Sequence, residues 1–218
     1  MKRALLFCFF CATTLISHAQ VKYILEGGYA LTANFSPSLA LREPINGIQI
    51  DAAVDYRFKA YPFLGIKGGL GYKLVGYYSD TRRLMSPTDN RNTVSEEYII
   101  DHSVFLPARL TVNFDVNNWT LRVLTGPKLS YHFGEMYYNT KSTEENNYSF
   151  IWIKSNLGYV YVPFDCSWGV GFGCAYNHLY LETGLDLGLF NRTRRDHASY
   201  RVNSLSSREF YLTIGYIF

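Results

Sequence analysis

Charged residues are scarce in this 218-residue chain: Asp, Glu, Lys and Arg together make up only 18% of it. The 21 basic and 18 acidic residues leave a formal net charge of +3. An intrinsically disordered polyampholyte needs more charge and fewer aromatic residues, and a nucleic-acid-binding domain needs a strong basic field. The composition excludes both classes, and no nucleic-acid partner is expected.

Long hydrophobic runs are also missing. The longest uncharged apolar stretch, residues 4–16, has about 13 residues, whereas a membrane-spanning helix needs ~20, so a helical membrane protein is excluded. This stretch follows two basic residues and precedes small residues, which is the layout of a secretory signal peptide. We predict a signal peptide over residues 1–19, cut between Ala19 and Gln20, with a retained membrane anchor as the alternative.

Cysteine is rare, and the predicted cut leaves only Cys166 and Cys174. If they share one strand, as the pattern below indicates, they lie about 26 Å apart at ~3.3 Å per residue. A disulfide needs Cα atoms within ~7 Å, so no bridge is expected. Two cysteines without a nearby histidine pair also make a poor zinc site, and we predict no metal and no cofactor.

Aromatic residues are abundant, at 17% of the chain, and apolar residues alternate with polar ones along much of it. The clearest examples are residues 48–58, 119–133 and 179–189. Helical spacing would scatter the charged residues of these segments over every side, so the period of two predicts β-strands.

The alternation predicts eight strands whose connections are long and short in turn. The predicted strands are residues 21–32, 46–58, 62–78, 97–114, 119–135, 160–176, 178–190 and 206–218. The short connections fall near residues 59–61, 115–118 and 177, and the long ones at 33–45, 79–96, 135–159 and 191–205. This asymmetry is typical of an outer-membrane barrel with tight periplasmic turns and long extracellular loops.

An exported β-sandwich or a lipocalin-like barrel has similar strand spacing. Two features favour the membrane barrel instead: strands of up to about 13–18 residues, against a usual 5–6 in globular proteins, and charges gathered on the face opposite the apolar one. The six acids and six bases of that face are Glu26, Asp51, Asp55, Asp165, Glu182, Asp186, Arg57, Lys67, Lys73, Arg109, Arg122 and Lys128. We predict an all-β fold: an eight-stranded antiparallel transmembrane barrel over residues 20–218, monomeric, in the outer membrane.

The last strand ends with an apolar face that includes the terminal residue. Its members are Phe210, Leu212, Ile214, Tyr216 and Phe218. A terminal aromatic that completes such a face resembles the C-terminal signal read by the barrel-assembly machinery, which is therefore an expected partner during biogenesis.

Three further motifs lie within the predicted strands: residues 102–110 (HSVFLPARL), 126–131 (GPKLSY) and 168–176 (WGVGFGCAY). They resemble segments of the PorT-like, porin-family outer-membrane β-barrel proteins, and the resemblance extends over nearly all of the mature chain. The resemblance implies a membrane barrel without implying a particular task. One branch of the family assists protein secretion across the outer membrane, so an envelope or secretion-system protein is a further expected partner.

An eight-stranded barrel encloses a space just wide enough for side chains, so inward charges are expected to pair and seal it. We therefore predict a structural or interaction role, in which long polar loops contact lipopolysaccharide, a surface ligand or an envelope partner. The alternative is a narrow porin for small solutes. A lipid-modifying enzyme is less favoured. Ser130 and His132 are two residues apart and share a face, but they point inward and have no identifiable orienting carboxylate.

Overall fold

The computed structural model describes residues 20–35, 43–82, 94–139, 148–152, 163–190 and 206–218. Nine strands lie in these residues. They are β1 (Gln20–Phe35), β2 (Glu43–Phe58), β3 (Tyr61–Arg82), β4 (Val94–Val116), β5 (Trp119–Asn139), β6 (Tyr148–Trp152), β7 (Phe164–Tyr176), β8 (Leu179–Gly188) and β9 (Ser206–Ile217). Within them no helix is long and apolar enough to cross a membrane.

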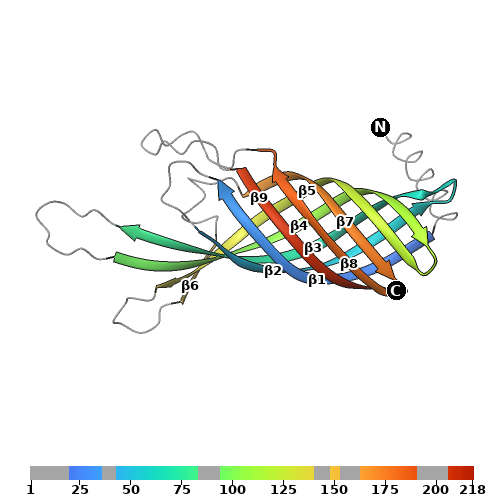
Figure 1. Cartoon of the computed structure of the whole chain (residues 1–218). Helices are drawn as coiled ribbons and strands as arrows, with labels where there is room; N and C mark the ends of the chain where they lie inside the picture. Colours follow the sequence, from blue (N-terminus) through green and yellow to red (C-terminus); the bar gives the residue numbers. More distant parts are fainter. Residues whose placement is uncertain (1–19, 36–42, 83–93, 140–147, 153–162, 191–205) are drawn as a thin grey trace, which may run out of the picture.

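Eight of the strands form a closed antiparallel ring, as the sequence predicted (Figure 1). Each strand pairs with its sequence neighbours, apart from β6; β1 pairs with β9, and β5 pairs with both β4 and β7. The ring leaves no open sheet edge in the barrel wall. Since every unpaired backbone group is costly in lipid, closure is what allows a sheet to span a membrane.

The register closes the ring with a stagger of ten residues. Stepping from Gln20 to the paired residue on each next strand leads back to β1 at Ala30. The intermediate positions are Arg57, Gly65, Thr111, Leu124, Gly171, Gly184 and Tyr211. Such a stagger over eight strands goes with a strand tilt of roughly 35–45° and an interior that side chains can fill.

Three two-residue turns join strands at one end of the barrel, where the C-terminus also lies (Figure 1). They separate β2 from β3, β4 from β5, and β7 from β8, at the places where the sequence predicted short connections. Asn117 and Asn177 begin two of them with φ values of 54° and 52°. Asparagine tolerates this left-handed conformation better than most residues, which suits it to tight hairpins.

Side chains alternate between the two faces of the wall in the predicted sense. Leu, Ile, Val and aromatic residues stand exposed on the outside, including Ile48, Leu129, Phe172 and Leu185. The inside is mostly polar, with a small apolar cluster at the end that carries the turns. That cluster consists of Ile24, Ala53, Ala175, Tyr180 and Ile217.

Strands at the opposite end reach further than predicted. β3 continues to Arg82, β4 begins at Val94, and β5 continues to Asn139, so the predicted loops at 79–96 and 135–159 are shorter than expected. The segment 135–159 also contains β6, which pairs with the end of β5 and was not predicted. These strands extend past the ring as a small sheet, in the order β3-β4-β5-β6 (Figure 1).

Candidate functional site

The twelve charged residues predicted for the inner face are all buried, with at most 8% of any residue exposed. Because alternate residues of every strand point inward, eight strands bring side chains that are distant in sequence into one interior. Ion pairs join most of them. Their arrangement divides into two linked groups near the middle of the barrel and two separate pairs toward the turns.

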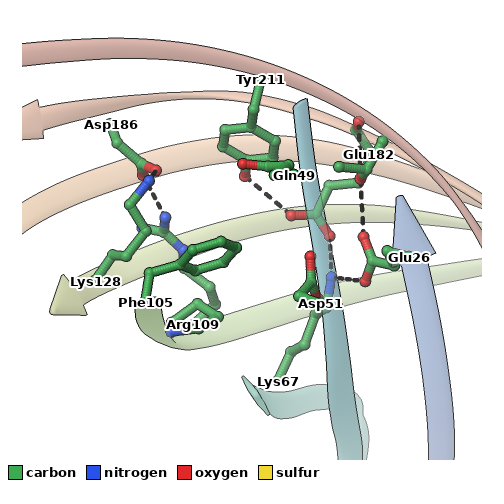
Figure 2. Close-up of a pocket in the computed structure, with 12 residues that line it drawn as sticks. Glu26, Gln49, Asp51, Lys67, Phe105, Arg109, Lys128, Glu182, Asp186 and Tyr211 are labelled. Carbon is green, nitrogen blue, oxygen red and sulfur yellow. Dashed lines mark hydrogen bonds and ion pairs between the residues drawn. The ribbon is translucent and has the colours of Figure 1, made fainter. Parts of the chain in front are cut away.

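Lys67 of β3 is the centre of the first group. Its ammonium contacts the carboxylates of Glu26 and Glu182, the latter at 2.6 Å (Figure 2). Glu182 also accepts hydrogen bonds from the hydroxyls of Tyr180 and Tyr211, the latter at 2.9 Å. One ammonium and two phenols thus satisfy a carboxylate that would be costly to bury alone.

The second group is a chain of alternating charges. Asp186 is shared by Arg109 and Lys128, with 2.5 Å between Lys128 Nζ and Asp186 Oδ2. Lys128 also contacts Glu209 at 2.8 Å, and Glu209 contacts Lys73 at 2.5 Å. Lys128 additionally lies 5.5 Å from the centre of the Phe105 ring. Five charged side chains from five strands therefore cross-link the interior.

Two ion pairs lie nearer the turns. Arg122 donates to Asp55 at 2.5 Å, and neither side chain is exposed at all. Arg57 donates to both carboxylate oxygens of Asp115, at 2.9 and 3.2 Å, and Asp115 is half exposed.

Sequence reasoning missed three of the carboxylates in these contacts. Glu209 and Asp101 are buried on the inner face, and Asp101 lies 2.5 Å from the imidazole of His132. The signal was present in both cases: each has the same parity as inward residues of its own strand. Asp115, at the end of β4, is the partner of Arg57. Asp165, a predicted member, is buried near the far end of β7.

Glycines on the inner face leave the room that these long side chains occupy. A Cβ atom at Gly169 would overlap the Asp186 carboxylate and the Arg109 guanidinium. At Gly171 and Gly184 it would meet the Tyr211 hydroxyl. The glycine-rich stretch of β7 is thus explained by the volume of charged and phenolic groups on facing strands.

A cavity of about 30 Å³ lies between the two groups of ion pairs (Figure 2). Its twelve lining residues are Glu26, Gln49, Asp51, Lys67, Phe105, Pro107, Arg109, Lys128, Glu182, Asp186, Tyr211 and Thr213. Such a volume accommodates one or two water-sized particles and no larger solute.

Ser130 and His132 are both buried inside the barrel. Asp101 supplies the carboxylate that the sequence did not identify, since it lies against the His132 ring. A catalytic role would still require a lipid substrate to enter the closed wall, because the pair faces away from the lipid side.

Aromatic side chains gather on the outer face near both ends of the apolar wall. Toward the turns, the rings of Trp119 and Tyr176 lie 4.6 Å apart. Toward the other end, the Tyr72 hydroxyl lies 2.6 Å from His102 Nδ1, and Phe133 stacks on Tyr72. Aromatic girdles of this kind mark the two membrane interfaces of a transmembrane barrel.

The predicted C-terminal signature lies on the lipid-facing side of β9. All five of its side chains are exposed, and the strand pairs with β1 and β8. The terminal Phe218 amide donates to the carbonyl of Tyr23 at 2.9 Å, and its ring packs edge-on against Tyr216.

A family model described as the outer membrane protein beta-barrel domain matches residues 19–194. The chain belongs to this family. Membership places the protein in the outer membrane, and the short turns then face the periplasm. The finer PorT-like resemblance stays a prediction.

Several solved outer-membrane barrels are similar to the chain in fold. Ail of Yersinia pestis, in complex with the heparin analogue sucrose octasulfate, is 12% identical; the match covers 91% of this chain and 99% of Ail, with a TM-score of 0.43. Neisserial surface protein A is 14% identical over 92% and 99%, with a TM-score of 0.41. OprG of Pseudomonas aeruginosa is 9% identical over 92% and 97%, with a TM-score of 0.42. No curated protein sequence matches the chain.

Proposed function

We propose that this outer-membrane barrel is a surface interaction protein that contacts the sugars of lipopolysaccharide, and that its interior is a structural plug. The observation that carries the proposal is the sheet that extends beyond the barrel ring. The cross-linked interior supports it, because most of the charged side chains there are paired with one another and the cavity between them is small.

The extension continues four strands outward from the membrane. β3 and β4 stay paired as far as Arg82 and Val94, and β5 carries β6 on its far edge. Tyr138 lies 19 residues after Trp119, the first residue of β5. At ~3.3 Å per residue and a tilt of about 40°, this is about 48 Å from the periplasmic end, well beyond an apolar band of ~25 Å.

Four tyrosines occupy one cross-strand row of the extension. The register pairs Tyr78 with Tyr98, Tyr98 with Tyr138, and Tyr138 with Tyr148. Tyrosine combines an apolar ring with a hydroxyl group, a chemistry suited to sugar rings. These four sequence positions lie at the height where lipopolysaccharide carries its oligosaccharide.

The test uses the barrel in phospholipid nanodiscs and deacylated lipopolysaccharide core oligosaccharide, which cannot insert into the bilayer. Calorimetric titration of the wild type should give saturable binding. The double variant Tyr98→Ser/Tyr138→Ser should bind at least about tenfold more weakly, a loss of ~1.4 kcal/mol. The matched control is Tyr61→Ser/Phe63→Ser at the periplasmic end, which should bind like the wild type. Equal affinity in both double variants would refute the tyrosine row as the contact.

A narrow porin is the second candidate, favoured by the cavity between the ion-pair groups. Planar-bilayer recordings separate the two functions. We expect no steady open channel from the wild type, since the cavity is small and walled by paired charges; reproducible conductance would favour the porin.

Export of the chain depends on the proposed signal peptide at residues 1–19, which lies outside the described residues. N-terminal sequencing of the mature protein tests the cut before Gln20.

The outer edge of β6 is a proposed binding site for a partner protein. Within the described strands β6 pairs with β5 alone, so its other edge offers backbone groups to an added strand. An envelope or secretion partner would bind there, and cross-linking in native membranes would identify it. A monomeric state is expected from the closed wall.

A further inference from the structure

The cavity inside the barrel has an uneven charge balance. The ion pairs around it link four cations to four carboxylates, so these groups neutralise one another. The eight residues are Lys67, Lys73, Arg109, Lys128, Glu26, Glu182, Asp186 and Glu209. Asp51 lines the same cavity as a ninth charged group, and no ion pair with it occurs among the described residues. With all nine groups ionised, the cavity carries one excess negative charge.

Asp51 is also deeply placed, with only 7% of the residue exposed. A buried carboxylate that forms no ion pair is costly, since the interior screens charge far less than water does. Either a cation bound beside the carboxylate or a proton on it removes this cost.

The side chain of Gln49 favours a bound cation. It precedes Asp51 by two residues on β2, so both side chains share the inner face, and both line the cavity (Figure 2). Gln49 is 8% exposed, and its Oε1 has no hydrogen-bond partner among the described residues. One cavity is therefore lined by an amide oxygen without a hydrogen-bond partner and by a carboxylate without an ion pair. Both are hard oxygen donors, which small hard cations prefer.

We propose that this cavity binds one monovalent cation of sodium size, through the Asp51 carboxylate and Gln49 Oε1. The volume of about 30 Å³ fits one such ion with a water molecule. No group of three His, Cys, Asp or Glu side chains in the described part of the chain is arranged to hold a metal ion. A single carboxylate and an amide therefore make a site for a singly charged ion, and not for zinc or calcium.

The first test compares salts at constant ionic strength. The refolded full-length mature barrel is unfolded with urea in sodium chloride and in choline chloride, whose cation is too large for the cavity. A ligand that binds only the folded state multiplies the folded-to-unfolded ratio by one plus the ratio of its concentration to its Kd. At ten times the Kd, sodium should raise that ratio roughly tenfold over choline.

Variants then assign the effect to the cavity. Asp51→Asn removes the charge and Gln49→Met removes the amide oxygen at similar length; in both, the advantage of sodium over choline should disappear. Asp55→Asn is the matched control, because Asp55 is an inward carboxylate on the same strand that is already paired with Arg122. It should lose stability and keep the sodium effect.

A direct measurement uses thallium(I) as a heavy stand-in for the ion. Crystals of the wild type soaked in thallium acetate should show an anomalous peak between Asp51 and Gln49, and crystals of Asp51→Asn should not. Equal stability of the wild type in sodium and choline would overturn the proposal. So would an infrared band of a protonated carboxylic acid that Asp51→Asn removes, since a proton would then supply the missing charge.

Discussion

Breaking the buried pair Asp55–Arg122 should be far more harmful than replacing both residues. The two side chains are fully buried and joined at 2.5 Å, and the Arg122 guanidinium also lies 5.3 Å from the Tyr180 ring centre. Removing one partner leaves a buried charge uncompensated, which costs about 3–5 kcal/mol. An apolar pair of similar volume is often neutral or even stabilising. The single variants Asp55→Leu and Arg122→Met should therefore each lose about 3–5 kcal/mol, and the double variant about 0–2 kcal/mol.

The Asp55 and Arg122 substitutions should show a large coupling energy. If the single losses add to about 6–10 kcal/mol and the double variant loses about 2 kcal/mol or less, the coupling is at least about 4 kcal/mol. Urea unfolding in lipid vesicles, followed by the fluorescence of the three tryptophans, measures the free energy of unfolding of the wild type, the two single variants and the double variant. Additive losses would show that the two charges stabilise the barrel independently, and would refute the paired-charge account of the interior.

Two further predictions concern the two faces of the wall. Gly169→Ala should destabilise the barrel by about 1–3 kcal/mol in the same unfolding assay, because its Cβ overlaps the Asp186 carboxylate, whereas Gly27→Ala, with ordinary contacts only, should be nearly neutral. A spin label on Cys174, in a Cys166→Ser background, should be reached by oxygen more than by a water-soluble nickel chelate. A similar accessibility of the label to the chelate would contradict the lipid-facing position of that residue.

Strand positions and faces were predictable because a membrane barrel imposes one rule on every residue of its wall. Lipid outside and polar groups inside enforce a period of two, so the alternation of residues 179–189 predicts both the strand and which of its side chains face the lipid. β6 was not predictable in this way, because it pairs beyond the ring, where no lipid contact requires alternation. Its sequence, YSFIW, carries no such pattern.

The pairing of the inward charges was not predictable, since it depends on the stagger with which the ring closes. Lys67 and Glu182 are 115 residues apart and meet only because eight register relations place them at one height. A change of stagger by two residues would keep every side chain on its face and exchange the partners. The inner-face position of Glu209, by contrast, follows from the parity of its own strand.

The terminal residue provides a last prediction, which separates recognition during assembly from stability in the membrane. Phe218→Asp should reduce the folded, heat-modifiable fraction in cell membranes several-fold. The expected stability cost alone is small, because a charge near the interface costs only about 0–1 kcal/mol. Tyr61→Asp is the matched control: Tyr61 is 59% exposed and Phe218 68%, both at the periplasmic end, but Tyr61 is not part of the last strand. If the assembly machinery reads the end of β9, Phe218→Asp should fail in cells while refolding normally from urea into detergent. If instead both variants lose the same folded fraction in cells, interfacial burial explains the terminal phenylalanine and the assembly signal is refuted.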